Sequence, residues 1–129
     1  MHRSNLKVTF IMTKIRKVIV YKHYFDEFVA EQRPDVRRKI FRVIQALETY
    51  QRIPSSFIKH LSGTRGLYEA RIMLGSNIWR VFCFFDSDSI IVLLNGFQKK
   101  TEKTPKTEIE RALRLMNEYF ETKRKNNGH

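Results

Sequence analysis

The chain has 129 residues, a length that suits one domain with a single hydrophobic core. Hydrophobic residues make up 42% of it and aromatic residues 12%, which indicates a folded domain and excludes a disordered tail. The formal net charge of +12 must lie on the surface, so it favours nucleic acid, an anionic membrane or an acidic protein as partner.

Membrane, secretory and metal functions find little support in the sequence. No apolar run approaches the roughly 18 residues of a membrane-spanning helix; Ile90–Leu94, which no other run exceeds, has the length of a strand. Val8–Met12 is too short for a signal peptide, and Lys14 follows it closely. Cys83 is the only cysteine, so neither an internal disulfide nor a cysteine-based zinc site can form. We expect a cytoplasmic protein without a metal or cofactor.

The first half of the chain predicts one strand and two helices. Residues 14–21 are rich in β-branched side chains and predict a strand. Residues 24–31 predict a short helix. Pro34 suits the first position of a second helix, which should end before Pro54. Apolar residues recur in this second helix at spacings of three and four: Val36, Ile40, Val43, Ile44 and Leu47.

The second half predicts a loop at 54–66, three strands and a helix. The strands are expected at 67–73, 77–85 and 89–95, and short polar separators favour antiparallel hairpins between them. Thr104 is expected to cap a last helix that begins at Pro105. This order of elements predicts an α+β fold, an antiparallel sheet with helices packed on part of it.

The chain divides into three predicted parts. We expect an N-terminal extension at 1–13, a single domain at 14–122 and a basic, frayed tail at 123–129. Met1 and Met12 both remain possible native starts.

The segment LLNGFQKKTEKTP, residues 93–105, is the strongest local signal. Its apolar start predicts a strand that ends at Asn95-Gly96 and delivers Phe97 and several lysines to a rim. Cations at a strand end can hold a polyanion at one place, although lysine-rich turns are often plain solvent-exposed surface. The rim residues are Phe97, Lys99, Lys100 and Lys103.

Two arginines interrupt otherwise apolar strands. Alternation places Glu69 and Arg71 on one face of their strand, and Arg80 on the same face as Phe82 and Phe84. Such arginines need an ion pair or a groove. For these two arginines, a structural ion pair with Glu69 and a ligand-binding role are equally open interpretations. If Arg71 and Arg80 adjoin the lysine rim, they complete a basic patch with Phe97 as a stacking surface for RNA bases.

Three stretches carry a family resemblance: GLYEAR at 66–71, WRVF at 79–82 and LLNGFQKKTEKTP at 93–105. Together they resemble the HigB-like (phage Gp49-like) branch of the RelE/ParE toxin superfamily, and the likeness runs from about Val18 to Phe120. The resemblance implies a small α+β toxin with an N-terminal helical pair and a C-terminal helix around a curved antiparallel sheet. RelE and HigB members cut messenger RNA on the ribosome, and ParE members poison DNA gyrase. The implied partner is a helix-turn-helix antitoxin.

The resemblance also implies roles for single residues. Arg71 and Arg80 would contact the scissile phosphate, Lys99 and Lys100 would hold the RNA or ribosomal backbone, and Phe97 would position a base. The predicted nucleic-acid-binding residues are Asn95, Phe97, Lys99, Lys100 and Lys103, and the predicted catalytic residues are Arg71, Arg80, Lys99, Glu69 and His60.

Two positions depart from the family pattern. Cys83 stands where relatives commonly have tyrosine, and Asn95 where they commonly have histidine. Each change removes a candidate acid or base, for which Glu69 or His60 could substitute. Three functions stay open: a ribosome-dependent endoribonuclease as the leading hypothesis, a gyrase-poisoning toxin, and a degenerate member that only binds its antitoxin.

Overall fold

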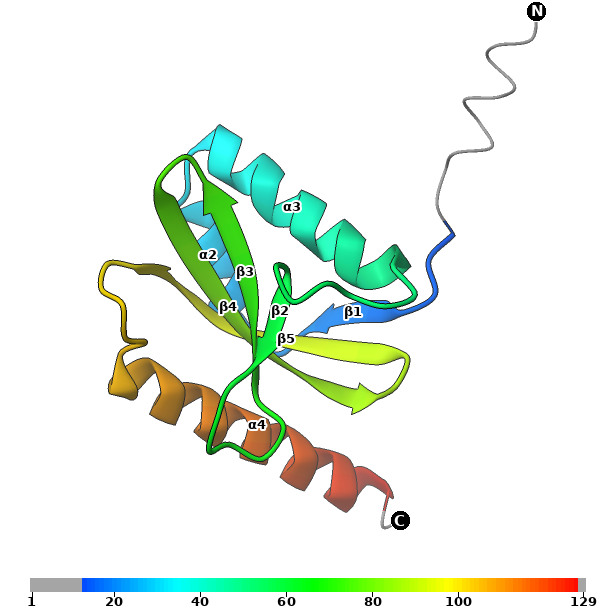
Figure 1. Ribbon diagram of the computed structural model, residues 1–129. Coiled ribbons are helices and arrows are strands. Elements are labelled where there is room, and N and C mark those ends of the chain that lie inside the picture. Colours follow the sequence, from blue (N-terminus) through cyan, green and yellow to red (C-terminus); the bar gives the residue numbers. More distant parts are fainter. Residues whose placement is uncertain (1–12, 128–129) are drawn as a thin grey trace, which may run out of the picture.

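One five-stranded sheet separates two helical layers in the computed structural model, which describes residues 13–127 (Figure 1). The strand order is β1-β5-β4-β3-β2. The elements in chain order are β1 (Lys17–Val20), α2 (Tyr24–Ala30), α3 (Pro34–Thr49), β2 (Ile58–His60), β3 (Tyr68–Leu74), β4 (Asn77–Ser87), β5 (Ile90–Lys99) and α4 (Lys106–Asn127). The predicted extension and the choice between Met1 and Met12 fall outside the described residues, apart from residue 13.

The predicted α+β fold is confirmed, with one difference in the sheet. Strands β2, β3, β4 and β5 pair antiparallel, as expected, whereas β1 runs parallel to β5. After β1, the chain passes through α2 and α3 to β2 at the far edge of the sheet, and the antiparallel series from β2 to β5 then brings β5 back beside β1. The sheet is therefore mixed.

Side-chain alternation along β4 gives each face of the sheet its own core. Trp79, Val81 and Cys83 pack toward α2 and α3. Phe82 and Phe84 point the other way and pack against α4. This is the division of faces that the alternation predicted. Figure 1 shows α3 and α4 on opposite sides of the sheet.

Helix α3 follows its predicted course, and an arginine from outside the helix caps its C-terminal end. Pro34 lies at its first position, and it ends at Thr49, ahead of Pro54. The guanidinium of Arg16 donates to three carbonyl oxygens at the C-terminal end, those of Leu47 (2.9 Å), Tyr50 (2.7 Å) and Gln51 (2.8 Å). These bonds satisfy carbonyls that have no partner within the helix.

Helix α4 is longer than the sequence predicted. It continues through Asn127, so the frayed tail expected from residue 123 is wrong over most of its length. The cause is a set of side-chain anchors. Glu118 accepts hydrogen bonds from Tyr21 (3.0 Å) and Lys22 (2.9 Å). One turn further, Lys123 pairs with Asp86 at 2.6 Å. None of the helices within residues 13–127 has the length and apolarity to cross a membrane.

Three local predictions need correction. The expected loop at 54–66 contains the short strand β2. Thr104 does not cap α4; its hydroxyl donates to Glu69. Strand β5 does not end at Asn95-Gly96 but runs on to Lys99. Val81 pairs with Gly96 and Cys83 with Leu93, so β5 has one residue more than β4 over this stretch. This is a β-bulge, and from the sequence alone it resembles the end of a strand.

Gly96 is required by the helix that crosses it. A Cβ atom at this position would lie 2.6 Å from the ring of Phe28 on α2, closer than any real contact of that kind. The glycine therefore lets α2 pack directly on β5, while the strand continues beneath it.

Candidate functional site

A hollow of about 510 Å³ lies between the β3–β4 hairpin, the end of β5 and the loop that follows it. In Figure 1 the hairpin tip and the turn from β5 to α4 lie on the same side of the molecule. Most of the charged residues that line the hollow are cationic. The lining residues are Arg71, Ser76, Ile78, Arg80, Lys99, Lys100, Thr101 and Glu102.

Strand register explains how cations from three strands reach one place. Arg71 on β3 lies directly opposite Arg80 on β4. On the other side of β4, Ile78 pairs with Lys99 on β5. Because directly opposed residues point to the same face, all of these side chains emerge on the α4 side of the sheet. The predicted convergence of the two arginines with Lys99 and Lys100 is therefore present.

Arg80 is buried and paired. It is 2% exposed, and its Nε donates to Glu69 Oε1 at 3.2 Å. The other carboxylate oxygen of Glu69 accepts a hydrogen bond from the hydroxyl of Thr104 at 2.8 Å. Burial lowers the pKa of Arg80, the Glu69 carboxylate opposes that change, and the charge of Arg71 adds to it. The structural ion pair, one of the two open alternatives, is thus present for Arg80.

Arg71 is half-buried and pairs with no carboxylate among residues 13–127. Its guanidinium makes a long hydrogen bond, 3.5 Å from Nη1 to the carbonyl oxygen of Ser55. Within residues 13–127, Nε of Arg71 and Nη1 of Arg80 are buried without a hydrogen-bond partner. A buried donor that lacks an acceptor costs about 1–3 kcal/mol. The site thus holds two adjacent positive charges whose hydrogen-bonding capacity the protein leaves partly unused.

The lysine rim divides into two parts. Lys99 is half-buried and Lys100 exposed, and both line the hollow. Lys103 is exposed but is not among the lining residues. Phe97 lies beside Phe82 with ring centroids 5.5 Å apart, so part of its ring is already packed against the α4 core.

Three predicted or conspicuous residues lie away from the hollow. His60 is exposed and packs edge-on against Tyr68, which belongs to the opposite face of the sheet. Asn95 is 2% exposed and donates to Glu108 Oε1 at 2.9 Å. Cys83 is fully buried on the α2 and α3 side, and desolvation raises its pKa to about 12. The two positions that depart from the family pattern thus contribute nothing to the hollow.

Sequence reasoning missed four lining residues: Ser76, Ile78, Thr101 and Glu102. Ser76 lies in the turn between β3 and β4, a signal that alone names no function. Glu102 was overlooked because it stands among lysines, yet it is the only carboxylate in the lining. Among residues 13–127, no group of three or more His, Cys, Asp or Glu side chains is placed to hold a metal ion.

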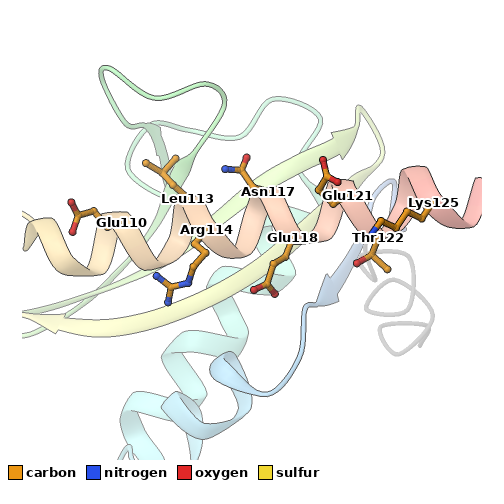
Figure 2. Close-up of a pocket in the computed structure, with 8 residues that line it drawn as sticks. All are labelled: Glu110, Leu113, Arg114, Asn117, Glu118, Glu121, Thr122 and Lys125. Atoms are coloured by element: carbon orange, nitrogen blue, oxygen red, sulfur yellow. The ribbon is translucent and has the colours of Figure 1, made fainter.

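A second hollow, of about 650 Å³, runs along the outer face of α4 (Figure 2). Its charges largely cancel, with three glutamates against one arginine and one lysine, and Glu118 is already bonded to Tyr21 and Lys22. Such a surface has no preference for a polyanion. The hollow at the hairpin, by contrast, gathers four cations around one carboxylate, and we take it as the candidate site.

Two kinds of comparison relate this chain to known proteins. Residues 27–117 match the model of the family described as Phage derived protein Gp49-like (DUF891). The structure is similar to a chain of the archaeal RelE–RelB complex from Pyrococcus horikoshii OT3, with a TM-score of 0.50 and 21% identity over 67% of this chain and 97% of that one.

A RelB–RelE complex from Methanococcus jannaschii gives a TM-score of 0.48 and 15% identity over 67% of this chain and 99% of that one. A comparison with curated proteins gives no match. Since the family model spans well over half of the sequence, the chain belongs to the Gp49-like family, as the sequence resemblance predicted. The likeness to the archaeal complex shows a shared fold.

Proposed function

We propose that this protein is the toxin of a toxin–antitoxin pair and cleaves messenger RNA on the ribosome, in the cytoplasm. The observation that carries the proposal is the hollow at the hairpin, where four cations face a single carboxylate. Family membership supports the toxin role. The archaeal RelE is solved together with RelB, and by analogy we propose a small antitoxin, of the helix-turn-helix type, as partner here.

The two arginines would act differently. Arg71 is half-buried and has no carboxylate partner in the described part of the chain, so it can contact a phosphate directly through a bidentate pair of N–H groups. Arg80 lies behind the surface and is held by Glu69, so it would act through its charge in a poorly solvated environment. Lys99 and Lys100 would hold the flanking phosphates.

Cleavage needs no external nucleophile, because the 2′-hydroxyl of RNA can attack the adjacent phosphate. As its oxygen bonds to phosphorus, negative charge develops on the phosphate oxygens, and the guanidinium groups stabilise that charge. The 5′-oxygen of the next nucleotide then leaves with a proton, and a 2′,3′-cyclic phosphate remains on the upstream fragment.

Proton transfer would fall to groups in the lining. Both oxygens of Glu69 already accept hydrogen bonds, from Arg80 and Thr104, so this residue is poorly placed to act as a base. Glu102 is exposed in the lining and can take the proton of the 2′-hydroxyl, while Lys99 can supply one to the leaving oxygen. His60 lies on the other face of the sheet and has no part in this proposal.

A second candidate function is antitoxin binding without cleavage. The specific observation in its favour is that Cys83 and Asn95 stand where relatives commonly have tyrosine and histidine, and that both are buried outside the hollow. With cysteine and asparagine at these two positions, the protein would keep a phosphate-binding surface but have fewer groups for proton transfer.

The test is induction of the protein in cells followed by mapping of new RNA 5′ ends. We expect cuts within translated messages together with growth arrest, and loss of both in Arg71→Gln, because its side chain makes no ion pair that the fold requires. Arg114→Gln, on the outer face of α4, is the matched control and should behave like the parent. Growth arrest with DNA breaks and no RNA cuts would indicate a gyrase poison and contradict the proposal.

A further inference from the structure

Helix α3 lies on the side of the sheet opposite α4 (Figure 1). Its outer face is a second basic surface. Its inner face is fully packed; Ile40 is 1% exposed and Leu47 is 0% exposed. Phe41, on the outer face, is 53% exposed, the most exposed large hydrophobic residue of the described chain. We call the outer face the α3 surface; it comprises Arg37, Arg38, Phe41, Arg42 and Gln45.

Helical spacing groups these side chains around the aromatic ring. Arg38, Phe41, Arg42 and Gln45 follow one another at positions i, i+3, i+4 and i+7, so they share one face. Arg37 stands one turn before Phe41 and borders the same face. Each arginine therefore lies within one helical turn of an exposed ring.

The positive charge of the α3 surface is not neutralised locally. Helix α3 contains two carboxylates, and each is already paired: Asp35 with Arg33 at 3.3 Å and Glu48 with Lys14 at 3.5 Å. Within residues 13–127, Arg37, Arg38 and Arg42 make no salt bridge. An exposed phenylalanine among three unpaired arginines serves no purpose in the core of this fold.

We propose that the α3 surface binds unpaired RNA, with phosphates on Arg38 and Arg42 and one base stacked on Phe41. Arginine pairs with phosphate in a planar, bidentate geometry, and an aromatic ring stacks on any base. A membrane is a poor fit, because interfacial helices need a broad apolar face, and here a single aromatic residue is surrounded by polar ones. The surface shares no residue with the hollow and would hold a separate stretch of RNA.

The test is fluorescence anisotropy of a labelled 20-nucleotide single-stranded RNA, titrated with the full chain at several salt concentrations. Phe41→Ala should weaken binding roughly 5- to 150-fold and leave the salt dependence unchanged, since it removes stacking but no charge. Arg38→Gln with Arg42→Gln should reduce the slope of log K against log salt by about 1.4, because each phosphate contact on a single strand contributes about 0.7. Arg114→Gln with Arg124→Gln, two exposed arginines on α4, is the charge-matched control and should change the slope much less.

The outcomes separate this inference from the proposed function. If both α3 variants bind RNA as tightly as the parent and only Arg71→Gln loses affinity, the proposed RNA binding by the α3 surface is refuted and the proposed role of the hollow stands. Loss in the α3 variants with no effect of Arg71→Gln would support the α3 surface and count against the hollow. Every variant should unfold at the same midpoint urea concentration as the parent, because the replaced side chains are exposed or make no structural ion pair.

Discussion

The buried pair between Arg80 and Glu69 makes the sharpest prediction about stability. Arg80→Met removes a guanidinium that is 2% exposed and leaves the carboxylate of Glu69, which is 5% exposed, buried without its partner. Breaking a buried pair in this way costs about 3–5 kcal/mol. A domain of this size has a free energy of unfolding of about 5–15 kcal/mol, so the loss would be a large fraction of the total.

A double-mutant cycle isolates the pair. Glu69→Gln keeps an oxygen that can accept the hydrogen bond from Thr104 but removes the charge. Arg80→Met with Glu69→Gln should therefore be more stable than Arg80→Met alone, because no unpaired charge remains buried. Urea unfolding followed by circular dichroism measures each corner of the cycle, with Arg71→Met as the control, since Arg71 makes no ion pair in the described chain. An Arg80→Met cost below about 1 kcal/mol with additive effects would refute this reasoning.

Two further predictions concern packing and pH. Gly96→Ala should lower stability by about 1–3 kcal/mol, since the new methyl group would meet the ring of Phe28 at 2.6 Å; an unchanged urea midpoint would contradict this close approach. Hydrogen bonds from Lys123 and Tyr119 lower the pKa of Asp86 in the folded protein. The ionised carboxylate therefore contributes its full stabilisation above the unfolded pKa of about 3.9, and this contribution is lost as the pH falls through the lower pKa of the folded state. The free energy of unfolding of Asp86→Asn should therefore fall less steeply between pH 5 and pH 2 than that of the parent or of an exposed control, Asp26→Asn, and equal slopes would count against this assignment.

Much of the fold could be predicted because local patterns determine it. Period-two alternation from Trp79 to Phe85 assigned the apolar side chains to their faces, since each face of β4 is packed into a core of its own. Pro34 and the apolar spacing that follows it located α3. In contrast, β2 escaped prediction because three residues carry no periodicity, and the bulge at Asn95 cannot be distinguished from a strand end without knowing that α2 lies on Gly96.

The candidate site was only partly predictable, for a related reason. Alternation predicts which residues share a face within one strand, but only the register between β3 and β4 places Arg71 opposite Arg80. Whether Arg80 faces a groove or a carboxylate depends on the register between β3 and β4, which puts Glu69 diagonally beside it. Loop residues are harder still to predict. Glu102 lines the hollow and its neighbour Lys103 does not, although both belong to the same lysine-rich run.

The chemistry of the cut RNA ends tests the central claim most directly. Purified protein would be added to ribosomes carrying a short message of known sequence, and the fragments would be analysed by mass spectrometry. A 2′,3′-cyclic phosphate on the upstream fragment and a 5′-hydroxyl on the downstream one, both lost in Arg71→Gln, are the predicted products. An intact message, or fragments made equally well by Arg71→Gln, would contradict the assignment of this cationic hollow as a ribonuclease site.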